Sequence, residues 1–284
     1  MKLFVTGGTG FIGSHFIRAA LAAGHQVTAI CRTPLRGEAF ENESARISWI
    51  ERALACITEE DLSGHDVLVH LASYGVSPKK CTWESAFQIN VVDGIHLIHK
   101  AANAKIPRIL LAGSCVEYGK SAEHYEQIPP NAPLAPLGAY AASKAALSLA
   151  ANSLCRELGI ELAILRFFTV FGEGQFEGNF WPALRKAALN GMDFAMSSGE
   201  QFCDFIPIEE AVAAAIRALA IPISAEEPLV ANIGSGKPQT LRAFAESWWM
   251  EWSAAGMLII GAKDYRPTDV MRYVPEVCKS LCNP

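Results

Sequence analysis

The stretch KLFVTGGTGFIG (2–13) decides the fold of this 284-residue chain. A short apolar run leads directly into a glycine-rich turn, and a helical pattern follows at 11–23. Gly7 permits the tight turn, Gly10 lets the backbone approach a pyrophosphate, and Gly13 lets the helix pack close to the sheet. The first amides of the helix supply donors and positive potential for phosphate oxygens. The stretch predicts a strand–turn–helix unit that binds a dinucleotide, the alternative being a glycine-rich turn without a ligand.

Outward from this stretch, short apolar runs alternate with longer helical patterns. The predicted strands are 2–6, 26–31, 47–50, 66–72, 108–113 and 161–167, and the predicted helices between them are 11–23, 83–104 and 139–158. Continuous apolar strands separated by helices are typical of a parallel sheet that is covered on both faces. The sequence therefore predicts an α/β fold with a Rossmann-type doubly wound parallel sheet.

The pattern changes after Arg166, where glycine, proline and aromatic residues become frequent. Two further helices and a short strand follow, predicted at 208–220, 240–252 and 230–234. We expect a dinucleotide-binding domain and a smaller C-terminal substrate-binding portion. The predicted division is 1–167 for the first, with 205–232 partly returning to it, and 168–204 together with 233–284 for the second.

Composition excludes several classes of function. The formal net charge of −5 and the pI of about 5.8 give no support to nucleic-acid binding, which needs a basic patch. The eight cysteines form no CxxC pair, so reduced thiols are expected, and neither disulfides nor a metal site. No signal peptide and no apolar run long enough to span a membrane is recognised. We expect a cytoplasmic protein with a small-molecule substrate.

The end of the second predicted strand bears on the choice of cofactor. NAD-preferring sites usually place Asp or Glu there, to bind the adenosine ribose hydroxyls. This chain has Cys31 followed by Arg32, with Arg36 nearby. A guanidinium suits a 2′-phosphate, although two solvated surface arginines are the alternative interpretation. The sequence favours NADP(H) over NAD(H).

The stretch GAYAASKAAL (138–147) carries Tyr140 and Lys144 four residues apart, on one face of the predicted helix. A free phenol has a pKa of about 10, and a neighbouring ammonium together with the charge of the cofactor would lower that pKa. The pair could then exchange a proton with an alcohol oxygen, and Ser114, at the end of the strand 108–113, would hydrogen-bond the same oxygen. The alternative is a tyrosine that anchors a helix by its tip, beside a snorkelling lysine.

Taken together, these motifs resemble the extended short-chain dehydrogenase/reductases, the NAD(P)-dependent nucleotide-sugar epimerase/dehydratase/reductase family. The matching pieces run in family order over nearly the whole chain: TGGTGFIG (6–13), HLAS (70–73), INVVDGIHLIHKA (89–101), GSCVEYG (113–119), YAASK (140–144), LRFFTVFGEGQ (165–175), NIGSG (232–236) and YRPTD (265–269). The resemblance implies a nucleotide-sugar substrate. It also suggests a homodimer formed through the helices at 83–104 and 139–158.

The resemblance implies catalytic roles for Ser114, Tyr140 and Lys144, and for Asn90 a part in organising the proton path. The alternative for Asn90 is a helix kink or an amide that satisfies backbone groups. The cofactor-binding positions implied by motif and resemblance are Gly7, Thr9, Gly10, Phe11, Ile12, Gly13, Arg32, Leu71, Ala72, Ser73, Lys144 and Phe167. The substrate-binding positions are Tyr74, Gly75, Ser114, Asn179 and Arg266, where a loop amide and a surface salt bridge are the alternatives for the last two.

Departures from the family narrow the reaction. Dehydratases of this family carry adjacent Asp and Glu directly after the catalytic Ser or Thr, and this chain has Cys115 and Val116 there. Glu117 comes one place too late and, on a strand, would face the other way. We therefore do not expect a dehydratase, and we interpret Cys115 as a small packed residue.

Two reactions need only Ser, Tyr, Lys and the cofactor: NADPH-dependent reduction of a 4-keto nucleotide sugar, and NAD-dependent 4-epimerisation. The Cys31–Arg32 strand end and the compact stretch 178–210 favour the reductase; the stretch resembles, more weakly, the reductases of the CDP-abequose or CDP-paratose synthase type. A non-catalytic NADP(H)-binding regulator is the third alternative. Such proteins typically lose the Tyr or the Lys, and this chain keeps both.

Overall fold

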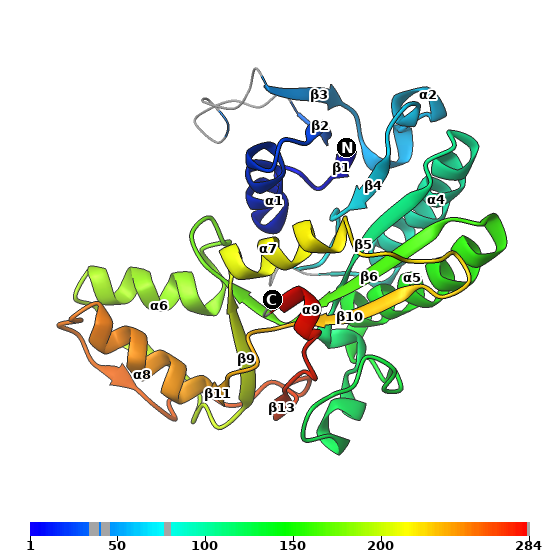
Figure 1. The fold of residues 1–284 in the computed structure, drawn as a ribbon. Helices are drawn as coiled ribbons and strands as arrows, with labels where there is room; N and C mark the ends of the chain where they lie inside the picture. Colours follow the sequence, from blue (N-terminus) through cyan, green and yellow to red (C-terminus); the bar gives the residue numbers. More distant parts are fainter. Residues whose placement is uncertain (34–39, 41–45, 77–80, 283–284) are drawn as a thin grey trace.

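A parallel seven-stranded sheet forms the centre of the protein, in a computed structural model that describes residues 1–33, 40, 46–76 and 81–282. The strand order is β10-β6-β5-β4-β1-β2-β3 (Figure 1). The strands are β1 (Lys2–Thr6), β2 (Gln26–Cys31), β3 (Ile47–Glu51), β4 (Val67–His70), β5 (Arg108–Ser114), β6 (Glu161–Phe167) and β10 (Leu229–Ile233). The predicted doubly wound α/β fold is confirmed. The strand order reverses between β1 and β4, which is where ligands of such sheets bind.

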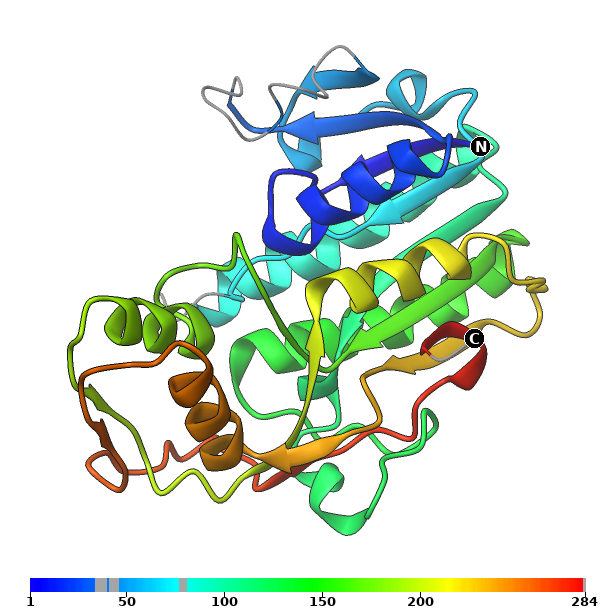
Figure 2. The same ribbon diagram turned by 60° about the vertical axis from the view of Figure 1, so that its left-hand side comes forward.

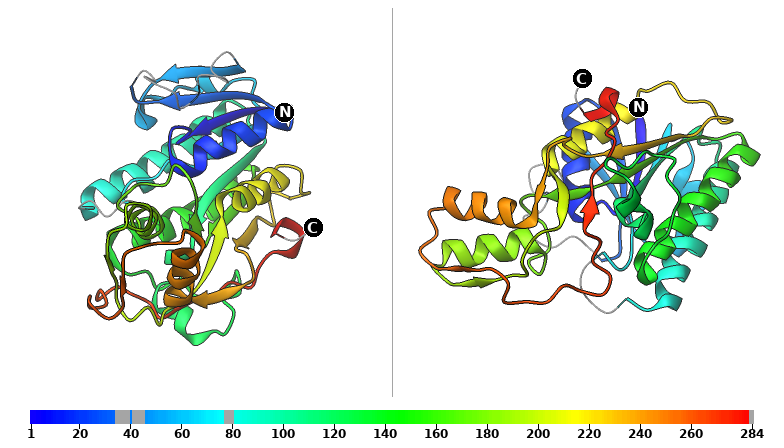
Figure 3. Two further views of the ribbon diagram at one scale, coloured as in Figure 1. Left: turned by 90° about the vertical axis from the view of Figure 1, so that its left-hand side faces the viewer. Right: turned by 90° about the horizontal axis from the view of Figure 1, so that it is seen from below.

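Helices cover both faces of this sheet. They are α1 (Phe11–Ala22), α2 (Glu59–Leu62), α3 (Trp83–Ala86), α4 (Asp93–Asn103), α5 (Gly138–Leu158), α7 (Ile208–Ala218) and α9 (Lys279–Cys282). One face carries α1 and α7, which pack against each other, and the opposite face carries α4 and α5 (Figures 1 and 3). Leu3 and Val5 pack in the core on the side of α1 and α7, and Phe4 packs in the core on the side of α4 and α5, because successive side chains of a strand point to opposite faces. Because both faces are buried, the strands read as continuous apolar runs.

The helix predicted at 83–104 is interrupted in the structure. After α3, a π-helical segment (Phe87–Val92) widens the helix before α4 begins. The side chain of Asn90 lies in this segment and is buried, and its amide binds the backbone of Tyr74. A π-helical turn accommodates one extra residue, and such turns are frequent at functional sites.

The rest of the chain forms a separate layer of small elements (Figure 2). They are β7 (Thr169–Phe171), α6 (Phe180–Leu189), β8 (Phe194–Ala195), β9 (Phe202–Pro207), β11 (Pro238–Thr240), α8 (Leu241–Glu251), β12 (Leu258–Ile259) and β13 (Arg272–Tyr273). An aromatic cluster packs α6 and α8 against β7 and β9, and the rings of Phe205 and Phe244 stack with centroids 3.9 Å apart. The division of the chain into a cofactor and a substrate portion stays a prediction.

Asp204, in β9, ties this layer to the seven-stranded sheet. Its side chain is fully buried, and its two oxygens accept hydrogen bonds from the backbone amides of Ser235 and Gly236, at 2.6 and 2.7 Å. These amides belong to the loop that follows β10, the edge strand of the large sheet. Asp204 therefore holds two sheets together through charge-assisted hydrogen bonds.

Replacing Asp204 tests how much its carboxylate contributes to the stability of the fold. Asp204→Ala leaves the partly buried amides of Ser235 and Gly236 without this acceptor and should lower the free energy of unfolding by about 1–3 kcal/mol, measured by urea denaturation. Asp264→Ala, at an exposed position, is the control and should leave the midpoint unchanged. Equal midpoints for both variants would show that Asp204 is dispensable for the junction.

Candidate active site

The glycine-rich turn after β1 is shaped by close backbone contacts. A Cβ on Gly7, whose φ is +73°, would lie 2.5 Å from the amide nitrogen of Ala72. A Cβ on Gly13 would lie 2.1 Å from the carbonyl oxygen of Gly7. The sequence predicts that Gly13 lets the helix approach the sheet. In the structure its close neighbours are instead the backbone atoms of Gly7 and Gly8, so this glycine lets α1 fold back on the turn itself.

The first turn of α1 is open to an anion. Gly10 caps the helix without a side-chain hydrogen bond, and the first turn contains no acidic residue. Thr9 and Gly10 are exposed, while Phe11 and Ile12 are half-buried. Free amide groups and the helix dipole attract phosphate oxygens. The turn therefore fits the pyrophosphate of a dinucleotide.

The segment after β4 lies against the same turn. Leu71 donates its amide to the carbonyl oxygen of Thr6 at 3.2 Å, and Ala72 donates to the Thr6 hydroxyl at 3.3 Å. That hydroxyl also contacts the ring nitrogen Nδ1 of His70, 2.7 Å away. Burial first, then the charge of Lys144, lower the pKa of His70 to about 3, so this histidine stays neutral. The predicted residues Leu71 and Ala72 thus border the phosphate turn, whereas the Ser73 hydroxyl lies near Tyr140.

The end of β2 does not decide between NADP(H) and NAD(H). Arg32 is exposed just beyond β2, and Arg36 lies outside the described residues. Cys31 is buried and pairs in register with Glu51 on β3. Burial and then the charge of Glu51 raise the pKa of the Cys31 thiol. A carboxylate is therefore absent from β2 but present at the end of the adjacent strand.

Ser114 and Tyr140, predicted to act together, are brought together. Ser114 ends β5, in register with the buried Phe167 on β6, and Tyr140 lies in the first turn of α5. Burial raises the pKa of the Tyr140 phenol, and the nearby hydroxyls of Ser73 and Ser114 lower it by less. A Cβ on Gly75 would lie 3.4 Å from the Cβ of Tyr140. Residues of three segments thus surround this phenol.

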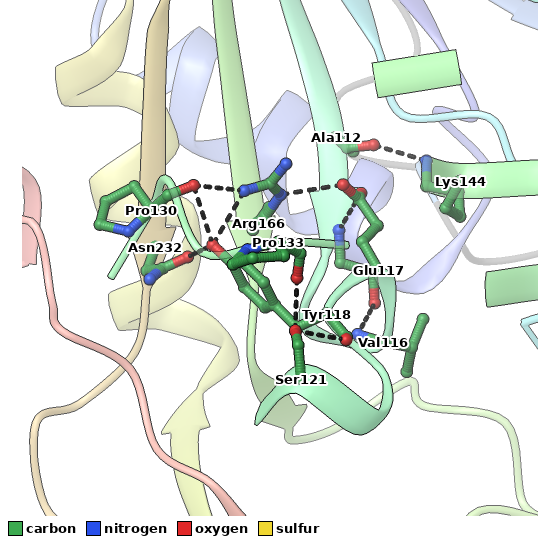
Figure 4. Close-up of polar contacts among 11 residues, drawn as sticks. Ala112, Val116, Glu117, Tyr118, Ser121, Pro130, Pro133, Lys144, Arg166 and Asn232 are labelled. Carbon is green, nitrogen blue, oxygen red and sulfur yellow. Dashed lines mark hydrogen bonds and ion pairs between the residues drawn. The ribbon is translucent and has the colours of Figure 1, made fainter. Parts of the chain in front are cut away.

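Lys144 lies one helical turn from Tyr140 and is buried. Its ammonium donates to the carbonyl oxygen of Ala112 on β5, as Figure 4 shows. Burial lowers the pKa of Lys144, and the charge of Glu117 raises it. In the chain without cofactor the pKa of Tyr140 is raised, because burial penalises the phenolate more than the neighbouring groups stabilise it. That Lys144 and the charge of the cofactor together lower this pKa stays a prediction.

Asn90 supports the segment that borders Tyr140. Its Oδ1 accepts from the amide of Tyr74 at 2.7 Å, and its Nδ2 donates to the Tyr74 carbonyl oxygen and to the Ser143 hydroxyl, at 3.0 and 2.9 Å. Both amide hydrogens of Asn90 are therefore occupied. These contacts fit the alternative of an amide that satisfies backbone groups, and the part of Asn90 in a proton path stays a prediction.

Glu117 lies in a turn, so the expectation for its side chain on a strand does not apply. The segment after Ser114 is a 3₁₀ turn (Cys115–Glu117), not a strand. The Ser114 hydroxyl accepts from the amide of Val116, and the Glu117 carboxylate accepts from the amide of Ser114 at 2.8 Å. This is a capping box, and the spacing Ser-x-x-Glu was the signal in the sequence that predicts it. Burial raises the pKa of the Cys115 thiol to about 12, so Cys115 is a packed, un-ionised residue.

The predicted substrate contacts in the C-terminal layer stay apart from this group. Asn179 is the N-cap residue directly before α6, and its amide donates to the carbonyl oxygen of Phe176 at 2.9 Å. Arg266 is exposed, and its amide donates to Asp269. Over the described ranges, neither side chain forms a hydrogen bond or ion pair with Ser114, Tyr140 or Lys144. Their roles stay predictions.

No group of three or more His, Cys, Asp or Glu side chains among the described residues is placed to hold a metal ion. Nor does any helix in this part of the chain combine the length and apolar character needed to cross a membrane.

A glycine turn for pyrophosphate and a Ser–Tyr–Lys group at the same edge of a parallel sheet define a dinucleotide-dependent enzyme of the Rossmann type. The sequence model of the NAD dependent epimerase/dehydratase family matches residues 3–234. This protein belongs to that family.

Known relatives carry three different activities. The dTDP-glucose 4,6-dehydratase of Streptomyces niveus is 27% identical over 205 residues, which are 67% of this chain and 60% of that protein. The GDP-6-deoxy-D-mannose reductase of Pseudomonas aeruginosa is 29% identical over 262 residues, 86% of this chain and 78% of that protein. Among solved structures, the UDP-N-acetylglucosamine 4-epimerase of Methanobrevibacter ruminantium M1, in complex with UDP-N-acetylmuramic acid, has a TM-score of 0.86 at 27% identity, covering 97% and 89% of the two chains.

The phosphate turn can be tested by two alanine variants. Gly10→Ala, at an allowed φ of −82° and with its nearest atom at 3.2 Å, should fold normally but lose roughly tenfold or more in cofactor affinity, because the new methyl group occupies the approach to the amides. Gly13→Ala should instead lower the melting temperature of the cofactor-free protein. Titration of bound cofactor by fluorescence, together with thermal melting, separates the two effects. A Gly10→Ala variant that binds cofactor as tightly as the wild type contradicts this assignment.

Proposed function

We propose that this protein is an NADPH-dependent reductase that converts the C4 carbonyl of a 4-keto nucleotide sugar into a hydroxyl, a reaction of deoxysugar biosynthesis. One observation carries the proposal. The Tyr140 phenol is enclosed, its pKa is raised, and the hydroxyls of Ser73 and Ser114 lie beside it. A protonated phenol is a donor, and reduction of a ketone needs a donor at the oxygen.

The chemistry follows from these residues. When bound, a reduced nicotinamide supplies the hydride that adds to the carbonyl carbon. Tyr140 donates its proton to the carbonyl oxygen, and the Ser114 hydroxyl hydrogen-bonds the same oxygen and orients it. The positive charge of Lys144, one helical turn away, stabilises the phenolate that remains after the transfer. The hydride and the proton together supply the hydrogen atoms of the new C–H and O–H bonds.

The neighbouring acids argue against elimination of water. Cys115 stands where dehydratases of this family carry Asp, and its thiol is un-ionised and buried. Both oxygens of Glu117 are engaged, one by Ser114 and the other by Arg166. The reductase relative from Pseudomonas aeruginosa supports the same assignment.

An NAD-dependent nucleotide-sugar 4-epimerase is the second candidate. It is favoured by the solved 4-epimerase with a TM-score of 0.86 and by Glu51, a carboxylate next to the end of β2. An epimerase uses the same Ser114, Tyr140 and Lys144 but returns the hydride, so it consumes no cofactor overall. A non-catalytic NADP(H)-binding regulator would show neither reaction. The homodimer and the cytoplasmic location remain predictions.

Turnover distinguishes these candidates. Incubation with NADPH and a panel of 4-keto nucleotide sugars should oxidise NADPH in proportion to product, followed by the loss of nicotinamide absorbance and by mass spectrometry. Tyr140→Phe should slow this turnover roughly 100-fold or more while cofactor affinity barely changes. Tyr125→Phe, whose hydroxyl makes no hydrogen bond with a described residue, is the control. Interconversion of nucleotide sugars without net NADPH loss would establish the epimerase instead.

Cofactor preference is tested at the end of β2. If Arg32 pairs with a 2′-phosphate, Arg32→Ala should weaken NADPH binding by roughly tenfold and leave NADH binding unchanged. Arg156→Ala, exposed near the end of α5, is the matched control. Equal dissociation constants of the wild type for NADPH and NADH, measured by fluorescence titration at one salt concentration, would overturn the preference for NADP(H).

A further inference from the structure

Two neighbouring strands, β5 and β6, are joined by an Arg–Glu ion pair at each end. At the amino ends, Arg108 pairs with Glu161, and these side chains are 16% and 35% exposed. At the carboxyl ends, Arg166 pairs with Glu117 at 2.9 Å, and these side chains are 6% and 0% exposed. Removing two charges from water is unfavourable unless their contacts compensate for it. The buried pair stands at the catalytic edge of the sheet, so its contacts there decide what it does.

Glu117 has no free oxygen. One carboxylate oxygen accepts the amide hydrogen of Ser114 at 2.8 Å, and the other accepts from Nε of Arg166 at 2.9 Å. A Cβ on Gly113 would lie 2.9 Å from the first oxygen, so the glycine leaves the room that this carboxylate occupies. Figure 4 shows the carboxylate between the turn that follows β5 and the guanidinium from β6. The carboxylate therefore fixes the backbone of Ser114 and, with it, the position from which the Ser114 hydroxyl extends.

Arg166 is itself held from several sides. Its NH1 group donates to the Tyr118 hydroxyl at 2.9 Å and to the carbonyl oxygen of Pro130 at 2.7 Å. Its guanidinium lies 4.7 Å from the centre of the Tyr118 ring, and the Tyr118 hydroxyl donates in turn to Asn232 on β10 at 2.6 Å. The turn after β5 and the loop at Pro130 contact the cation directly, and Asn232 on β10 contacts it through Tyr118, so the partner of Glu117 is held in place (Figure 4).

We propose that Glu117 is a positioning residue of this active site: its carboxylate, held by Arg166, fixes Ser114 and places a buried negative charge beside Tyr140 and Lys144. The inference rests on the proposed function in assigning a proton-donating role to Tyr140. The electrostatic part of it concerns the protein alone and does not depend on which carbonyl is reduced.

The charged and titratable neighbours define what that negative charge does. The groups that act on Tyr140 are Ser73, Ser114, Cys115 and Glu117, and the charge that acts on Lys144 is Glu117. His70, on β4, is neutral, because burial and then the charge of Lys144 lower its pKa. With Cys115 un-ionised, Glu117 is the anion of this set. It raises the pKa of Tyr140 and also that of Lys144, against the burial that lowers the latter. Burial remains the larger cause for both groups, and Glu117 adds to it at Tyr140 and opposes it at Lys144.

The test removes the charge and, separately, the reach of this side chain. Glu117→Gln keeps the shape and loses the charge, whereas Glu117→Asp keeps the charge and shortens the reach to Ser114. Glu161→Gln, in the ion pair at the opposite ends of the same strands, is the matched control. Ionisation of Tyr140 is followed by the ultraviolet absorbance of tyrosinate in the complex with oxidised cofactor, after subtraction of the Tyr140→Phe variant of each protein.

Glu117→Gln should ionise Tyr140 at lower pH than the wild type, by more than any shift in Glu161→Gln, because the anion that opposes the phenolate is gone. Glu117→Asp should titrate as the wild type does. Both variants should lower turnover roughly 10- to 100-fold, since Ser114 is no longer held in its reactive position. If Glu117 had a structural role only, the variants would lose stability, and the tyrosinate titration would not differ between Glu117→Gln and Glu117→Asp.

Two outcomes overturn the proposal: a Glu117→Gln titration that coincides with that of Glu161→Gln, or wild-type turnover in Glu117→Asp. Circular dichroism and thermal melting establish that each variant is folded. If Glu117→Gln does not fold, the Asp variant decides, with lost turnover at an unchanged tyrosinate titration supporting the proposal. The titration uses no sugar substrate, so a failure of the reductase assignment leaves its result readable.

Discussion

The close approach of the glycine turn to the end of β4 is the constraint on which the site depends. Gly7 leaves no room for a side chain against the backbone of Ala72, and Thr6 bonds the amides of both Leu71 and Ala72. This packing joins β1 and β4 where the strand order reverses. The phosphate turn, the segment beside Tyr140 and the end of β5 consequently meet at one edge of the sheet, and dinucleotide and substrate chemistry share that edge.

Burial sets the protonation states along this edge. It keeps His70 neutral, Cys115 un-ionised and the Tyr140 phenol protonated. A buried lysine stays cationic only if a nearby anion opposes the effect of burial on its pKa. Glu117 supplies that anion, and its own charge is compensated by Arg166.

The end of β10 takes part in two separate sets of contacts. Asp204, in the smaller layer, binds two backbone amides of the loop that follows β10. Asn232, on β10 itself, accepts a hydrogen bond from Tyr118, which also contacts Arg166 on the adjacent strand β6. The strand to which Asp204 fastens the smaller layer therefore also supports the surroundings of the buried ion pair.

Local features of the sequence were enough to predict the seven strands of the large sheet, the helices α1, α4, α5, α7 and α8, and the glycine turn, because periodicity and turn chemistry act over a few residues. The short strands of the smaller layer and helix α6 were not predicted. The capping box of Ser114 and Glu117 was equally local, yet its meaning depended on whether a turn or a strand follows β5. Only the tertiary structure decided that Glu117 meets Arg166, that Asn90 lies in a π-helical segment, and that the pKa of Tyr140 is raised. These properties arise from burial and from contacts between residues far apart in the chain, and no short stretch of sequence contains that information.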